Sequence, residues 1–138
     1  MSTSNPASTS TRSIRVSAAV ILNDRDELLL VRKAGTTAFM QPGGKPEAGE
    51  TPAETLSREL FEELGLSVEP DQLDPLGLFT AVAANEPGFL VVADVFVARI
   101  GDQVPVTDAE IEELRWVSRD DAPQLEIAPL AREYFLPS

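Results

Sequence analysis

The stretch PGGKPEAGETPAETLSRELFEELGL, residues 42–66, decides the fold because it carries the signals for both ends of a helix. Thr51 suits the N-cap and Glu54 the third helical position, and with the intervening proline they form a capping box. Gly65 suits the C-terminal cap, where a left-handed residue ends the helix. The sequence therefore predicts a helix over residues 52–64 that is entered from a Pro-Gly-Gly turn.

One side of this helix is crowded with negative charge. Glu59, Glu62 and Glu63 are neighbours on the helix surface, and like charges at such spacings destabilise a helix by a few tenths of a kcal/mol per pair. Arg58 lies four residues from both Glu54 and Glu62, so it can pair with one or both carboxylates and fix their rotamers. A solvated acidic face is the ordinary explanation, but the preceding loop favours another.

That loop has the features of a cradle for metal and phosphate. Gly43 and Gly44 allow the backbone to approach a ligand closely, and Lys45 follows them. The chain contains no histidine and no cysteine, which excludes a serine–histidine triad, thiol nucleophiles and thiolate metal sites. Any bound metal should therefore be a hard cation held by oxygen, such as Mg²⁺ or Mn²⁺.

The fixed residues of this loop and helix resemble the Nudix box, with no departure at any defining position. The resemblance rests on Gly44, Glu50, Arg58, Glu59, Leu60, Glu62, Glu63, Gly65 and Leu66. It implies an α/β (α+β) fold, the Nudix-type α/β/α sandwich with a mixed β-sheet between helices. It also implies hydrolysis of a nucleoside diphosphate linked to another moiety, by attack of water on a phosphorus of the pyrophosphate.

The resemblance further implies a metal-binding role for the acidic side of the helix. Glu62 and Glu63 should bind Mg²⁺ or Mn²⁺, and the Gly43 carbonyl is expected to be an extra ligand. Glu59 should be either a further ligand or the base that activates water. Such carboxylates raise one another's proton affinity until metal binds, so one of them can act as a base.

Other residues of the box are expected to support these ligands. By the same resemblance, Arg58 would orient the glutamates and take part in catalysis. Glu50 would brace the loop. Gly44 and Gly65 would have structural roles within the box.

Residues that contact the substrate are less clearly marked. Arg32 and Lys33, near the end of a predicted strand, and Lys45 in the glycine loop are candidates. Basic residues at strand ends are more often simple surface charges. Glu112 belongs to the acidic segment 108–113, for which a solvated loop is the plainer interpretation.

Several branches of the family lack their usual residues here. The ADP-ribose branch usually has a proline near residues 81–83 and the diadenosine-polyphosphate branch a tyrosine, whereas this chain reads Ala-Val-Ala. Isoprenoid isomerases of this fold rely on cysteine and histidine. Elimination favours a MutT-like pyrophosphohydrolase of (d)NTPs or modified NTPs. A nucleotide-sugar or ADP-ribose pyrophosphatase stays open, as does a non-catalytic nucleotide-sensing module.

The rest of the chain predicts a single domain over residues 14–138. Residues 1–13 are rich in serine and threonine and predict a disordered tail, with an organelle transit peptide as the alternative. Two apolar runs joined by Asp-Arg-Asp indicate a hairpin. Expected strands cover residues 14–23, 27–34, 76–84, 89–100 and 113–118, and a closing helix covers residues 128–135.

Charge and hydropathy limit the partners. A net charge of −12 repels the backbone of long nucleic acids, which favours a small nucleotide substrate over a polymer. No run approaches the roughly 18 apolar residues of a membrane span, and no secretory signal is present. We therefore expect a cytoplasmic protein that binds neither membrane nor nucleic acid, as a monomer or a homodimer.

Overall fold

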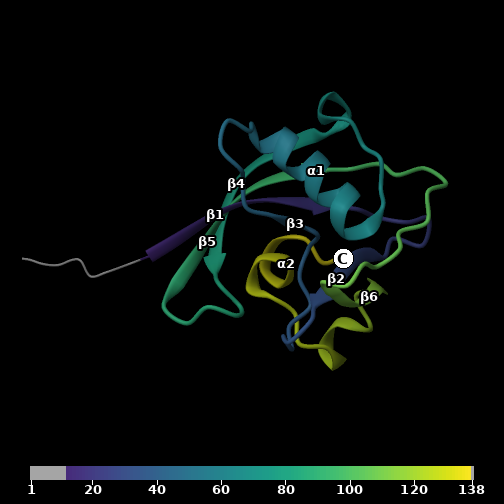
Figure 1. Ribbon diagram of the computed structural model, residues 1–138. Helices are drawn as coiled ribbons and strands as arrows, with labels where there is room; N and C mark the ends of the chain where they lie inside the picture. Colours follow the sequence, from purple (N-terminus) through teal and green to yellow (C-terminus); the bar gives the residue numbers. More distant parts are fainter. Residues whose placement is uncertain (1–11, 138) are drawn as a thin grey trace, which may run out of the picture.

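The computed structural model describes residues 12–137 and contains six strands, two α-helices and two 3₁₀ turns in this part of the chain (Figure 1). The strands are β1 (Arg12–Val20), β2 (Leu28–Lys33), β3 (Gly43–Gly44), β4 (Asp74–Val82), β5 (Phe89–Val97) and β6 (Ile111–Val117). The helices are α1 (Pro52–Leu64) and α2 (Pro129–Tyr134), and the 3₁₀ turns are η1 (Pro70–Gln72) and η2 (Ala122–Gln124).

The predicted N-terminal tail lies almost entirely outside the described residues. Its last two members, Arg12 and Ser13, belong to β1, so the predicted boundary at residue 13 is wrong. Both residues pair with β5, opposite Phe89 and Leu90. Backbone pairing with a strand far away in sequence extends β1 beyond its apolar segment.

The strands form a four-stranded mixed sheet and a separate two-stranded antiparallel sheet. The larger sheet has the order β3-β1-β5-β4, and the smaller one pairs β2 with β6. β1 and β5 are parallel, whereas β1 with β3, β4 with β5, and β2 with β6 are antiparallel. This confirms the expected mixed sheet.

The predicted hairpin between the first two strands is only partly correct. The turn is present, because the Asn23 and Leu29 amides donate to the Glu27 and Ile21 carbonyls at 3.1 and 2.9 Å. The main partners of β1 and β2 are nevertheless β5 and β6. The chain changes sheets here because β2 is buried on both faces: its alternating side chains enter two different apolar clusters.

The two apolar clusters lie on opposite sides of β2, and each is closed by one helix. Leu29 and Val31 join the cluster that contains the buried leucines of α1. Leu28 and Leu30 join the cluster that contains Leu130 of α2. Sheet residues lie between the two helices in Figure 1, which confirms the α/β/α arrangement. In the described part of the chain, no helix has the length and apolarity needed to cross a membrane.

Helix α1 has the ends that the sequence predicts. The Thr51 amide donates to Glu54 Oε1 at 2.9 Å, and the Glu54 amide donates to Thr51 Oγ1 at 3.2 Å, completing the capping box. Gly65 is left-handed with φ 67°, and its amide donates to the carbonyls of Leu60 and Phe61. The apolar face of α1 is thereby fixed against the core, and its acidic side faces the glycine loop.

Candidate active site

The glycine loop fits between β1 and α1 because it has no side chains there. Gly43 has φ +151°, and a Cβ at this position would lie 2.0 Å from the Ser17 carbonyl oxygen. A Cβ on Gly44 would lie 2.4 Å from Oε2 of Glu59. The Ser17 hydroxyl also donates to the Pro52 carbonyl at 2.8 Å, which ties β1 to the first turn of α1. Glycine is therefore required for the close approach of loop, strand and carboxylate.

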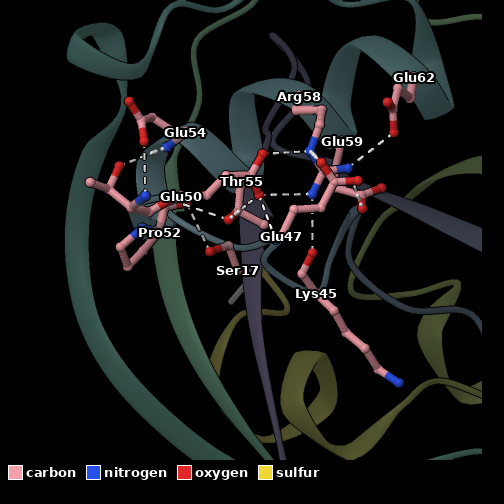
Figure 2. Close-up of polar contacts among 11 residues, drawn as sticks. Ser17, Lys45, Glu47, Glu50, Pro52, Glu54, Thr55, Arg58, Glu59 and Glu62 are labelled. Carbon is pink, nitrogen blue, oxygen red and sulfur yellow. Dashed lines mark hydrogen bonds and ion pairs between the residues drawn. The ribbon is translucent and has the colours of Figure 1, made fainter.

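Arg58 is the centre of the polar contacts in the box (Figure 2). Its Nε and Nη2 donate to the two carboxylate oxygens of Glu50 at 2.6 and 3.0 Å. Its Nη1 donates to both Glu59 and Glu62 at 3.1 Å. Its Nη2 also donates to the Lys45 carbonyl at 3.1 Å. One guanidinium thus connects three carboxylates with the backbone of the loop, using the fork geometry that lysine lacks.

Of the two pairs that helical spacing allows Arg58, the one with Glu62 is formed and the one with Glu54 is not. The Glu54 carboxylate accepts the Thr51 amide in the capping box, while Arg58 turns toward Glu50. A bond to the charged side chain of Glu50 joins the loop to the helix, and the capping carboxylate already has a partner. Helical spacing allowed Arg58 to pair with Glu54, with Glu62 or with both, and the structure forms the pair with Glu62.

Glu50 holds the loop against α1 through several donors. One carboxylate oxygen accepts the Glu47 amide at 2.8 Å and the Thr55 hydroxyl at 2.9 Å, and it also accepts from Arg58. The Arg58 hydrogen bonds, followed by the Glu47 amide, lower the pKa of Glu50 to about 2. In return, the pairing with Glu50 raises the pKa of Arg58 further. Both groups are therefore charged across the range in which the protein would function.

Glu63 lies on the buried side of the acidic group. It is only 3% exposed, and burial raises the pKa of its carboxyl to about 7. The Gly43 amide donates to Oε1 at 3.4 Å, and Lys33 Nζ lies 3.7 Å from Oε2. These contacts direct Glu63 toward the glycine loop and the end of β2, where a cation would relieve the cost of burying its charge.

Glu59 and Glu62 occupy different environments on the same side of α1. The Glu59 carboxylate lies directly against Gly44. Burial is the main cause that raises the pKa of Glu59, and the hydrogen bond from Arg58 opposes this rise. The Glu62 side chain is 55% exposed and is joined to Arg58 at the rim. The carboxylates are thus graded from buried Glu63 through partly buried Glu59 to exposed Glu62.

The carboxylates of Glu59, Glu62 and Glu63 are chemically suited to a hard divalent cation, although their oxygens do not converge on one point. Among residues 12–137, no group of three or more acidic side chains is close enough to hold a metal ion directly. Arg58 occupies the position between Glu59 and Glu62. Carboxylate oxygens and backbone carbonyls are nevertheless the ligands that Mg²⁺ and Mn²⁺ prefer, and a bound ion would further offset the cost of burying the Glu63 carboxylate, which is paired with Lys33 at 3.7 Å.

The predicted substrate residues fall into two groups. Lys33 is brought to the box, beside Glu63. Arg32 instead pairs with Glu112 and Glu113 at 3.1 and 3.4 Å, across the β2–β6 ladder. The structure therefore joins Arg32 to Glu112 rather than bringing either to the box carboxylates. Glu112 also lies within β6 and not in a loop before it.

Lys45 lies at the loop but contributes its backbone to the box. Its carbonyl accepts from Arg58, while its side chain extends away from these contacts in Figure 2. The charged end of Lys45 is therefore directed away from the carboxylates.

A cavity of about 120 Å³ opens beside the glycine loop. Gly43, Gly44 and Lys33 form one part of its wall, and residues from β4, β5 and α2 form much of the rest. Sequence reasoning missed its other polar residue, Gln41, for which a glutamine in an otherwise apolar extended segment was the available signal. A larger open groove of about 620 Å³ near the ends of β1 and β5 has no box residue in its lining.

These features define a class: an α/β/α protein in which a glycine loop lies against the acidic face of one helix. A family model, the NUDIX domain, matches residues 12–137. The chain belongs to the Nudix family, as the box predicts. The family uses divalent metal ions for hydrolysis.

Individual relatives agree with this assignment. The human protein named 8-oxo-dGDP phosphatase NUDT18 is 33% identical over 84% of this chain and 38% of its own length. A MutT-like protein of Streptomyces ambofaciens is 33% identical over 75% and 63%, respectively. The chain thus spans less than two thirds of both relatives. A solved NUDIX hydrolase from Nitrosomonas europaea matches with a TM-score of 0.69 and 27% identity, over 88% of this chain and 85% of that one.

Proposed function

We propose that this protein hydrolyses the pyrophosphate bond of a nucleoside diphosphate linked to another moiety, with Mg²⁺ or Mn²⁺ as cofactor. The observation that carries the proposal is that Glu59, Glu62 and Glu63 lie along one side of α1, with Glu59 and Glu63 against the glycine loop and with Glu59 and Glu62 bonded to Arg58. A (d)NTP or a modified NTP is the favoured substrate. The substrate is a small molecule, and the proposed compartment is the cytoplasm.

In this proposal Glu62, Glu63 and the Gly43 carbonyl hold the metal. When bound, the ion would neutralise the carboxylates and the diphosphate and would polarise a phosphoryl oxygen of the phosphorus under attack. Glu59, whose pKa is already raised by burial, is either a further ligand or the base that takes a proton from water. Lys33, next to Glu63, is suited to contact a phosphate oxygen.

Arg58 acts as a positioning residue in this scheme. It sets the directions of Glu59 and Glu62 through Nη1 and is itself held by Glu50. Metal binding requires Glu62 to leave Arg58, and exposed helix pairs at this spacing contribute only about 0.3–0.5 kcal/mol. The rearrangement is therefore small, because Glu62 already lies at the rim.

The substrate class is supported by the cavity and by the printed names of relatives. The cavity next to Gly43 and Gly44 has a mostly apolar wall, which suits a nucleobase better than a second charged group. The human relative is named for 8-oxo-dGDP, so oxidised purine nucleotides are the first compounds to test. Nucleotide sugars and ADP-ribose are the alternative substrates.

A substrate panel tests the proposal directly. Canonical NTPs, 8-oxo-dGTP, 8-oxo-dGDP, nucleotide sugars and ADP-ribose are incubated with the protein, and released phosphate and pyrophosphate are measured with Mg²⁺ and with chelator. We expect metal-dependent release from at least one nucleotide. Tight nucleotide binding without hydrolysis at saturating Mg²⁺ would instead establish the non-catalytic sensing module.

Gly44→Ala is expected to lower kcat/KM by about 10²-fold, because the added methyl group occupies the space of the Glu59 carboxylate and displaces it. Gly101→Ala is the control. Gly101 has φ +58° and open space around it, so this variant should lose roughly 1–2 kcal/mol of stability and keep its activity. Steady-state kinetics and urea unfolding measure both effects. Equal activity losses would contradict the role of Gly44.

Arg58→Lys is expected to lower kcat by about 10- to 100-fold, because one ammonium group cannot hold Glu50, Glu59 and Glu62 at once. Arg99→Lys is the matched control, since Arg99 pairs with Asp74 at the surface, where its side chain is 74% exposed. Unchanged kcat in Arg58→Lys, with the fold intact, would remove Arg58 from the scheme.

A further inference from the structure

Gln41 is a buried side chain with one unused hydrogen-bonding atom. It is 7% exposed, and its Nε2 donates to the Ala19 carbonyl at 3.0 Å. Its Oε1 is buried and has no partner among the described residues. Leaving a buried acceptor unpaired destabilises the protein, so Gln41 Oε1 is expected to have a partner in the working state.

The orientation of the Gln41 amide follows from its neighbour. A carbonyl oxygen can only accept, so the group that faces Ala19 must be the amide nitrogen. Reversing the amide would set two acceptors against each other. The free group is therefore an acceptor, and its missing partner must be a donor.

Gln41 lines the 120 Å³ cavity beside the glycine loop. Only two lining residues, Lys33 and Gln41, have polar side chains, and the walls include Val16, Val82 and Leu130. Lys33 is already drawn toward Glu63 by the ion pair at 3.7 Å. Gln41 is thus the neutral polar group available to orient a ligand in an otherwise apolar cavity.

We propose that the Gln41 carbonyl oxygen accepts a hydrogen bond from an N–H group of the nucleobase and determines which bases the protein prefers. This inference rests on the proposed function, in which the phosphates lie at the glycine loop and the base enters the adjoining cavity. A fixed acceptor favours a base edge that presents a donor over the same edge presenting a ring-nitrogen acceptor. An 8-oxopurine has an N–H at position 7, where guanine has an acceptor.

Nucleoside monophosphates test this inference without requiring catalysis. Dissociation constants are measured for three pairs that differ at a donor position: 8-oxo-dGMP with dGMP, dGMP with dIMP, and dAMP with the purine deoxynucleotide that lacks its amino group. We expect the donor-bearing member of at least one pair to bind about tenfold or more tightly. Gln41→Met should reduce that ratio to near one. Gln103→Met, the same change at a glutamine that bonds Ser67, should leave it unchanged.

A second variant protects the test against loss of folding. If Gln41→Met melts below the assay temperature, Gln41→Asn keeps the amide but withdraws it by one methylene, and it should reduce the same ratio. Equal ratios in parent and Gln41 variants, or no donor preference in the parent, would overturn the inference. A parent that binds bases through Gln41 but hydrolyses no nucleotide would support the inference while rejecting the proposed activity.

Discussion

Replacing Glu62 with glutamine is expected to lower kcat by about 10²–10⁴-fold while leaving the fold intact. The change removes the negative charge needed to hold a divalent cation but keeps the size of the side chain. Glu62 is 55% exposed, and its only ion pair among the described residues is with Arg58. The structural cost should therefore stay within the range of an exposed ion pair, below about 1 kcal/mol. Phosphate release at saturating Mg²⁺ and urea unfolding measure the two effects.

Glu54→Gln is the matched control for this prediction. It makes the same chemical change on the same helix, and glutamine also satisfies the capping box. Its carboxylate bonds the Thr51 amide and lies outside the Arg58 group. Activity should therefore survive in Glu54→Gln and be lost in Glu62→Gln. Equal turnover in Glu62→Gln and the parent would reject the hydrolase mechanism.

Replacing Glu63 with glutamine is expected to stabilise the metal-free protein at pH 8. Burial raises the pKa of Glu63 from 4.5 to about 7, so the folded state binds more protons than the unfolded state between these values. The free energy of unfolding of the parent should consequently fall as pH rises through this window, by up to about 3 kcal/mol. Glutamine does not titrate and avoids this loss.

Urea unfolding at pH 4.5 and pH 8 in the presence of a chelator checks this expectation. The stability advantage of Glu63→Gln should be present at pH 8 and largely absent at pH 4.5. Added Mg²⁺ should stabilise the parent more than the variant, because only the parent keeps the buried carboxylate. Parallel stability curves for both proteins across this pH range would show that Glu63 is not a buried, destabilised acid.

Local signals predicted the helical part of the site well. The capping box and Gly65 indicated both ends of α1, and the observed bounds agree with them. The strand partners were not predictable in the same way. β1 pairs with β5, joining Val16 to Ala93, and periodicity describes which face of a strand is buried but not which strand lies beside it.

Helical spacing also could not predict contacts between a helix and a loop or between distant strands. Arg58 bonds Glu50, eight residues away and outside the helix, whereas spacing could indicate only partners on the helix, Glu54 and Glu62. Arg32 and Glu112, predicted separately as substrate contacts, form a pair because β2 and β6 are adjacent. Gln41 was not predicted as a site residue, because the sequence does not indicate that its side chain is buried or that its oxygen is unpaired.

The sequence by itself determined the helix ends and the positions of the acidic residues, and its lack of histidine and cysteine leaves oxygen atoms as the expected ligands of any metal. These features depend on neighbouring residues and on residue type. The tertiary structure decided that Glu63 is buried while adjacent Glu62 is exposed, and that Gln41 and Lys33 share a cavity. Burial and the shared cavity both arise because segments that are distant in the chain pack against α1 and β3. The loss of solvent around Glu63 then raises the pKa of its carboxyl.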